Sequence, residues 1–111
     1  MKTQGRRCGL ALGALMLCGG ALAQDAATLR VRSLAATCAN CHGSEGRAVS
    51  GAAVPGLAGM PADYLAAQMQ AFRSGTRPAT VMHQIARGYS ETQVAQLAAY
   101  FSKQAVSEQA R

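Results

Sequence analysis

The sequence has few aromatic residues and no tryptophan. Its 111 residues include three Tyr and two Phe, and aromatic side chains usually supply much of the apolar area that a core buries. Chains of this size bury a limited share of their surface and often need a disulfide, a metal or another group to complete the core. The scarcity of aromatics therefore predicts that something other than side chains fills part of the interior.

A long hydrophobic run is also missing. The chain opens with MKTQGRRCGLALGALMLCGGALA, in which basic residues come first, a short apolar stretch follows and an A-x-A sequence ends the segment. This order is typical of a secretory signal peptide, so we expect residues 1–23 to be a signal that is cleaved before Gln24. The expected location of the mature protein is the periplasm.

Two other readings of this opening segment are less favourable. A membrane anchor needs about 20 apolar residues, and this run is shorter and rich in glycine. A lipid anchor on Cys18 would follow Leu17, a large residue where lipoprotein signals usually place a small one. We therefore expect no membrane span after cleavage.

Cleavage changes the charge and the cysteine count. The remaining 88 residues hold 8 basic and 5 acidic side chains, so the formal charge falls from +6 to +3. No basic cluster is interleaved with aromatics, which argues against a nucleic-acid-binding protein. The five carboxylates are scattered and only Glu45 lies near the cysteines that remain. The chain therefore predicts no acid–base site of its own, and we do not expect it to be an enzyme by itself.

Apolar spacing predicts helices and no strand. A first helix is expected from about Thr28 to Cys41, a second from Pro61 to Gly75, a short piece over VMHQIA and a last helix after Ser90. Ser90 with Gln93 three residues on forms a capping-box pattern. The stretch 43–59 is rich in Gly, Ser and Pro and predicts a long loop, of the kind that often wraps a ligand. The expected fold class is all-α.

The two cysteines that remain lie in CANCH, residues 38–42. Residues three apart on a helical turn face the same way, so Cys38 and Cys41 can each form a thioether with one vinyl group of a porphyrin. His42 then points at the iron. A C-x-x-C pair followed by His is the attachment sequence of c-type haem. A thioredoxin-like redox pair would need a βαβ pattern, and a structural zinc site would need a second ligand pair; both are absent from the sequence.

An electron-transfer haem needs a sixth ligand, for which the chain offers several candidates. Met69 falls in the apolar stripe of the second expected helix, and Met60 lies at a junction of loop and helix. Met82 lies far along the chain from His42, where a loop can close over the opposite haem face, and we favour it. His83 is the alternative, because it and Met82 cannot both point at the iron.

Three further residues are candidates for contacts around the haem. A ligating histidine usually donates its second ring N–H to a backbone carbonyl, and a carbonyl near Pro55 is the expected partner; an ordinary turn is the alternative. Arg73 and Arg77 could pair with the haem propionates, although exposed, solvated arginines are an equally good description of each.

Together these segments resemble class I cytochromes c over nearly the whole chain after residue 23. The matching segments are CANCH, PGLAG (55–59), YLAAQMQAFRSG (64–75), Met82 and SETQVAQLAAYFS (90–102). Within that class, PGLAGMPADYLAAQMQAFRSGTRP with TVMHQIARGYS looks like the cytochrome subunit of flavocytochrome c sulfide dehydrogenase, with cytochromes c4 and c5 as close neighbours. The resemblance implies three main helices and a short one around one covalent haem, in a monohaem domain spanning residues 24–111.

The resemblance also implies roles and partners. Cys38 and Cys41 would be the thioether links, and His42 and Met82 the axial ligands. A flavoprotein subunit with FAD would oxidise sulfide and pass electrons to this haem, which would hand them to a soluble acceptor. Some members of this subunit type have two haem domains, whereas this chain has one C-x-x-C-H motif.

Two other functions fit the same residues. A free monohaem carrier could serve other dehydrogenases or oxidases, and it would be monomeric and free of flavin. A haem sensor or gas-binding protein would need an open sixth site. The methionine at position 82 argues against this function.

Overall fold

Every regular element among the described residues, 25–106 of this computed structural model, is a helix. The chain divides into two units, one ending at Arg30 and the other beginning at Val31. In the first unit residues 25–30 are helical, and the expected signal peptide lies outside the described residues. The prediction of an all-α fold is confirmed.

The first predicted helix is wrong as a continuous element. Residues 31–36 are helical, residues 37–38 form a turn, and α2 then spans Ala39–His42. The Thr37 hydroxyl donates to the carbonyl of Leu34 at 2.7 Å, and the Cys38 N–H bonds the Ala35 carbonyl at 3.0 Å. Threonine side chains that bond a carbonyl one turn back compete with the regular helical ladder. The helix is therefore interrupted one residue before the first cysteine of CANCH.

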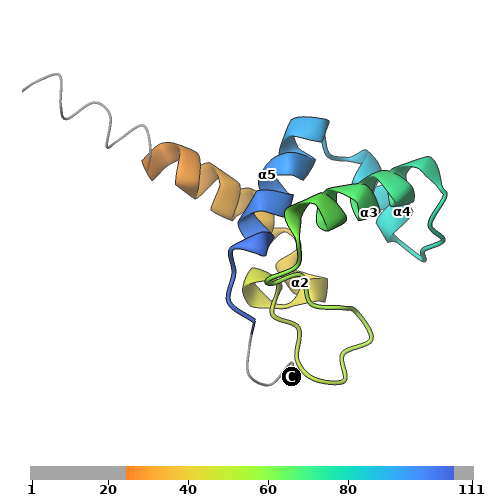
Figure 1. Ribbon diagram of the computed structural model, residues 1–111, viewed down its shortest axis with the longest axis horizontal. Helices are drawn as coiled ribbons and strands as arrows, with labels where there is room; N and C mark the ends of the chain where they lie inside the picture. The colour runs from red at the N-terminus through yellow and green to blue at the C-terminus, as the bar shows by residue number, and fades with distance from the viewer. Residues whose placement is uncertain (1–24, 107–111) are drawn as a thin grey trace, which may run out of the picture. The chain divides into compact units, whose positions relative to one another are not determined.

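The predicted loop over residues 43–59 is present, with one short 3-10 turn, Ser44–Gly46, at its start. In Figure 1 it projects from α2 and returns to the start of the next helix. Its two ends are joined, because the Gly46 carbonyl accepts from the N–H groups of Leu57 and Ala58 at 2.7 and 3.1 Å. The N–H of Gly59 donates to the Phe101 carbonyl at 2.9 Å. These bonds fix where the loop leaves and re-enters the core.

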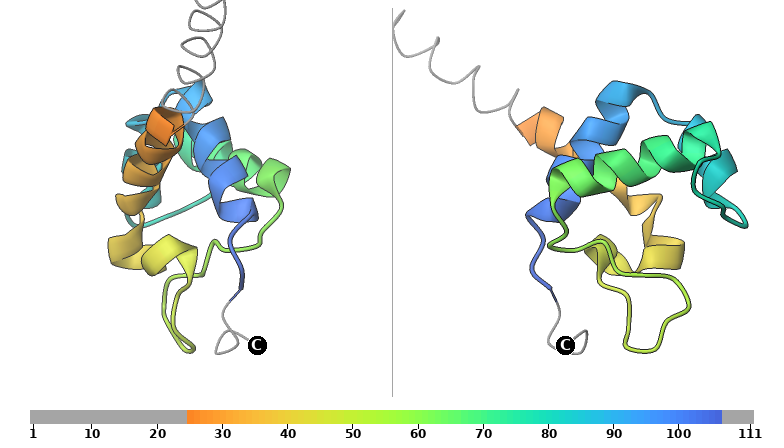
Figure 2. Two further views of the ribbon diagram at one scale, coloured as in Figure 1. Left: turned by 90° about the vertical axis from the view of Figure 1, so that its left-hand side faces the viewer. Right: turned by 45° about the vertical axis from the view of Figure 1, so that its right-hand side comes forward.

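Three helices follow, with boundaries close to those predicted. α3 spans Ala62–Ser74 and ends at Gly75, which adopts the left-handed conformation with φ 80°. α4 spans Met82–Arg87. α5 spans Glu91–Ser102, and the predicted capping box between Ser90 and Gln93 is confirmed. α3 packs against both α4 and α5 (Figure 1), and Figure 2 shows α4 folding back beside the C-terminal end of α3.

The core is small, as the composition predicts. The cluster of buried residues comes from residue 35, α3 and α5: Ala35, Leu65, Leu97, Ala98 and Phe101. The apolar spacing of α5 predicts one buried face, and the four residues of that face are buried: Val94, Leu97, Ala98 and Phe101. None of the larger side chains among the described residues is fully enclosed. Within this same part of the chain, no helix has the length and apolarity needed to cross a membrane.

Candidate functional site

His42, the last residue of α2, is a buried side chain with a defined ring orientation. It is 8% exposed, and its Nδ1 lies 2.7 Å from the carbonyl oxygen of Pro55. A carbonyl oxygen can only accept, so Nδ1 carries the proton and donates. The neutral ring then has its lone pair on Nε2, which is the arrangement that a metal-ligating histidine uses.

His42 faces a cavity of about 510 Å³. Its walls come from the turn before α2, the 53–60 loop segment, one face of α3, residues 77–85 and one face of α5. The lining residues are Thr37, Cys38, His42, Ala53, Val54, Pro55, Leu57, Met60, Tyr64, Leu65, Gln68, Met69, Phe72, Arg77, Pro78, Ala79, Thr80, Val81, Met82, Ile85, Tyr89, Val94, Leu97, Ala98 and Phe101. The cavity therefore lies at the centre of this unit, where an all-protein core would otherwise be.

The two thiols lie at one edge of this cavity. Cys38 is half-buried and lines the wall, whereas Cys41 is exposed and does not. The Cys41 N–H bonds the Cys38 carbonyl at 3.3 Å, which places the two residues one turn apart. Burial raises the pKa of the Cys38 thiol, although its hydrogen bond with Thr37 partly opposes this, and the neighbouring Cys41 raises it further. Neither cysteine is in a disulfide.

Met82 begins α4 and lines the same cavity as His42. Met60 and Met69 also line it, so three thioethers lie on its walls. His83 does not line the cavity; it is half-buried, and its Nδ1 has no hydrogen-bond partner among the described residues. The structure thus brings Met82 and His42 to one cavity and leaves His83 outside it.

The two candidate arginines differ in position. Arg77 lines the cavity, donates from Nη1 to Gln68 Oε1, and lies over the Phe72 ring at 4.7 Å from its centroid. Arg73 does not line the cavity. Its guanidinium donates to the carbonyl oxygens of Ala86 and Tyr89 at the end of α4. These bonds use Nε and Nη2 of Arg73, and the contact of Arg73 with a haem propionate stays a prediction.

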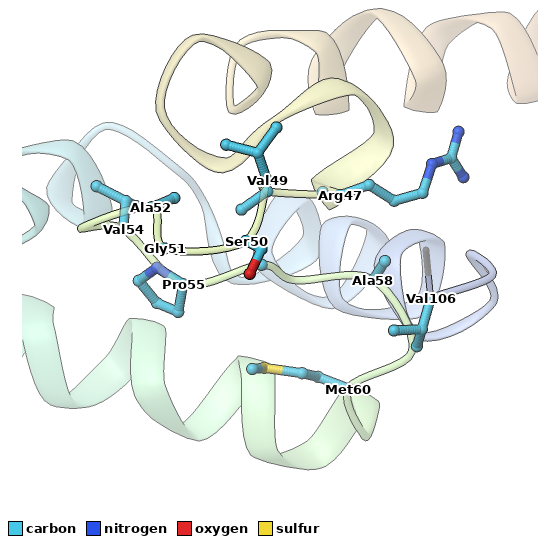
Figure 3. A pocket seen from close by; sticks show the side chains of 13 residues that line it. Arg47, Val49, Ser50, Gly51, Ala52, Val54, Pro55, Ala58, Met60 and Val106 are labelled. Atoms are coloured by element: carbon cyan, nitrogen blue, oxygen red, sulfur yellow. The ribbon is translucent and has the colours of Figure 1, made fainter. Parts of the chain in front are cut away.

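A smaller hollow of about 360 Å³ lies between the 46–58 loop and Val106. Figure 3 shows Met60 and Pro55 on its walls, with the Arg47 side chain extending away from both. Arg47 is paired with Glu45. No unpaired charge among the described residues faces this hollow, and it has no chemical group comparable to His42.

Comparison with known proteins identifies the family. The family model for cytochrome c matches residues 30–105. The chain belongs to the cytochrome c family. As a cytochrome c it carries covalent haem c, for which CANCH is the attachment motif, and it transfers electrons.

Its relatives include proteins of sulfur metabolism. Over 69 residues the chain is 45% identical to the thiosulfate dehydrogenase electron acceptor of Thiomonas intermedia, covering 62% of this chain and 32% of that protein. It is 34% identical to the cytochrome subunit of sulfide dehydrogenase of Chlorobaculum tepidum, covering 61% and 60%. It is 38% identical to cytochrome c-554(548) of Halomonas halodenitrificans, covering 61% and 84%.

A solved structure has the same fold. Thiosulfate dehydrogenase of Marichromatium purpuratum superposes with a TM-score of 0.59 and 34% sequence identity, covering 67% of this chain and 16% of that one. The chain also spans only about a third of the first two curated relatives, at 32% and 31% of their lengths. The matches therefore leave most of the length of these two relatives uncovered.

The walls of the cavity fit a haem. Three exposed large apolar side chains line it: Tyr64 at 47%, Val81 at 53% and Ile85 at 37% exposure. A flat apolar group in the cavity would cover them, and it would place its metal within reach of the free Nε2 of His42. The buried histidine, the adjacent thiols and the apolar walls are the donor set and surroundings of a c-type haem.

Sequence reasoning did not single out most of the cavity wall, and Thr37 and Tyr89 are two such residues. The Thr37 Oγ1 lies 2.8 Å from the Tyr89 hydroxyl oxygen, although the residues are 52 positions apart. No periodicity or motif relates positions so distant in sequence. The break in the helix at Thr37 likewise has no signal in apolar spacing.

Proposed function

We propose that this cytochrome c accepts electrons from an enzyme that oxidises a reduced sulfur compound and passes them to a soluble acceptor. In this proposal His42 and Met82 are the axial ligands, and Cys38 and Cys41 are the thioether links. When bound, the haem supplies reversible one-electron chemistry at its iron. The observation that carries the proposal is that His42 and Met82 line one cavity, with CANCH at its edge.

The geometry around His42 supports its role. The Pro55 carbonyl accepts from Nδ1 at 2.7 Å and so holds the ring in one orientation with Nε2 unprotonated. A second hydrogen bond of this kind also increases the basicity of a ligating histidine. His42 is 8% exposed, so little of its surface is in contact with solvent.

Met82 suits the sixth position for two reasons. It lies at the start of α4, half-buried on the cavity wall, and it is separated from His42 by the whole of α3. A methionine sulfur favours reduced iron and raises the reduction potential relative to a histidine ligand. A raised potential makes the chain a better acceptor from a dehydrogenase.

The names of the relatives support a sulfur-compound dehydrogenase as the donor. The similarity to a thiosulfate dehydrogenase electron acceptor, at 45% identity, and to a sulfide dehydrogenase cytochrome subunit, at 34%, points to that enzyme class. The segments PGLAG and MHQIARGYS support the finer proposal, in which the donor is an FAD-containing sulfide dehydrogenase subunit in the periplasm. The alternative is a free carrier, and it is supported by the similarity to cytochrome c-554(548), of which 84% is covered and whose name contains no dehydrogenase.

Spectroscopy of the native protein tests the donor. The haem protein is purified gently from its periplasmic fraction, and sulfide or thiosulfate is added while the visible absorption of the reduced haem is followed. Ascorbate reduces a parallel sample and establishes the full amplitude. A co-eluting flavin and rapid reduction by sulfide support the flavoprotein donor.

The other outcomes decide between the alternatives. Rapid reduction by thiosulfate with no flavin replaces the flavoprotein with a thiosulfate-oxidising donor. Slow reduction by both compounds, in a protein that elutes alone and that ascorbate reduces fully, refutes a bound sulfur dehydrogenase and supports a free carrier.

A further inference from the structure

One hydrogen-bond network joins the segment that begins with Met82 to the turn that begins CANCH. On the first side, Arg73 of α3 donates to the carbonyls of Ala86 and Tyr89, with the Ala86 bonds at 3.3 and 3.4 Å. On the second side, the Tyr89 hydroxyl meets Thr37, which directly precedes Cys38. The network therefore runs between the segments that carry the two proposed axial ligands.

The direction of the bonds at Thr37 follows from its single hydroxyl proton. The Leu34 carbonyl, 2.7 Å away, can only accept, so the Thr37 proton goes there. The Tyr89 hydroxyl, 2.8 Å from Thr37 Oγ1, must then be the donor. Tyr89 is half-buried and Thr37 is exposed, and both residues lie on the cavity wall.

The backbone of Tyr89 is held as firmly as its side chain. Its carbonyl and that of Ala86, which is completely buried, accept from one guanidinium. The planar donors of Arg73 can bond two carbonyls at once, which fixes the last turn of α4 against α3. A movement of α4 away from the cavity would have to break these bonds or the bond from Tyr89 to Thr37.

We infer that Tyr89 and Thr37 are positioning residues that keep Met82 on the iron, by joining the α4–α5 turn to the turn before Cys38. This inference rests on the proposed ligation by Met82. Detachment of the sulfur moves residues 82–89 relative to residues 37–42, and the bond from Tyr89 to Thr37 opposes that movement. Loss of the bond therefore increases the fraction of protein in which the sixth position is open.

Binding of imidazole to the oxidised holoprotein measures that fraction. Imidazole must displace the sulfur, so its apparent affinity is proportional to the population with Met82 detached. One hydrogen bond changes an equilibrium by roughly two- to tenfold. We expect Tyr89→Phe and Thr37→Val each to raise the apparent affinity for imidazole by about that factor.

The design separates positioning from a general loss of stability. Both variants remove the bond between Tyr89 and Thr37, and Thr37→Val also removes the bond to the Leu34 carbonyl and the contact with Cys38 Sγ. The double variant is therefore expected to match Thr37→Val and not the product of the two single effects. Thr37→Ser keeps the hydroxyl and restores the wild-type affinity. Tyr100→Phe is the matched control, because Tyr100 is also half-buried and its hydroxyl has no hydrogen bond among the described residues; its affinity is expected to be unchanged.

Three results would overturn the inference. These are an unchanged imidazole affinity in Tyr89→Phe, multiplicative effects in the double variant, or a lower resistance to denaturant with no change in imidazole affinity. Failure of the proposed ligation is seen separately, because the wild-type protein would then have no iron–methionine charge-transfer absorption before imidazole is added.

Discussion

At the scale of single residues, His42 is the only polar side chain that is buried within residues 25–106. A buried polar group without a partner costs about 1–3 kcal/mol, and Pro55 supplies the partner for Nδ1 at 2.7 Å. The ring orientation is thus determined by the protein before any metal is considered. Nε2 is therefore the ring nitrogen that is available to a group bound in the cavity.

Met82 is the residue whose replacement tests the ligand set. In the oxidised holoprotein, Met82→Ala is expected to abolish the iron–sulfur charge-transfer absorption and to lower the reduction potential, because the sulfur that favours reduced iron is lost. Visible absorption and protein-film voltammetry measure the two effects.

Met69 and Met60 supply the controls for that experiment, since both line the same cavity. Met69→Leu and Met60→Leu keep apolar volume and remove the sulfur, and the absorption is expected to persist in both. Persistence of the absorption in Met82→Ala, with its loss in either control, would assign the ligand to that other methionine.

Gly46 shows how one missing side chain fixes the loop. Its φ is +77°, and an added Cβ would lie 2.8 Å from Phe101 Cδ1 and 3.0 Å from Leu57 Cβ. Gly46→Ala is expected to lower the free energy of unfolding by about 2–4 kcal/mol, through backbone strain and overpacking. Denaturant titration of the holoprotein measures it.

Gly51 is the matched control, because its φ is +76° but nothing lies within 4 Å of an added Cβ. Gly51→Ala is expected to lower the free energy of unfolding only through backbone strain, by about 1–2 kcal/mol. Equal losses in the two variants would mean that contact with Phe101 contributes nothing.

At the scale of elements, α5 depends on its first turn. The Ser90 side chain accepts from the Gln93 N–H at 3.2 Å, and the Gln93 side chain accepts from the Ser90 N–H at 2.8 Å. Ser90→Ala is expected to lower the free energy of unfolding by about 1 kcal/mol. Ser102→Ala, at the opposite end of α5, is expected to change it by less than about 0.5 kcal/mol. A similar loss in both variants would contradict the role of the cap.

The sequence predicts elements well where the signals are local. The spacing of Val94, Leu97 and Phe101 together with the Ser90 cap predicts α5, and an apolar stripe that ends before Gly75 predicts α3. The break at Thr37 was not predicted, because apolar spacing continues through it. What interrupts the helix is a hydroxyl that bonds the Leu34 carbonyl, and this competition has no effect on periodicity.

At the scale of the whole molecule, the sequence predicts the part of the site that is a contiguous motif. CANCH indicates the haem because all of its groups are contiguous in sequence. The walls of the cavity come from segments far apart in the chain, so their assembly depends on tertiary packing. Arg73 illustrates the limit, since only the structure shows that its donors meet Ala86 and Tyr89.

The haem is therefore expected to make the largest single contribution to the stability of the fold. Only seven apolar residues among those described are buried, and three of them are alanines, around a cavity of about 510 Å³. Because burial contributes roughly 25 cal/mol per Å² of apolar surface, a core this small cannot offset the entropy lost when the chain is ordered.

Protein produced without haem is expected to lack cooperative thermal unfolding and near-ultraviolet circular dichroism, while keeping some helical signal. A sharp, two-state thermal transition in the haem-free protein, together with a near-ultraviolet circular dichroism signal from ordered side chains, would show that the side chains alone specify the fold.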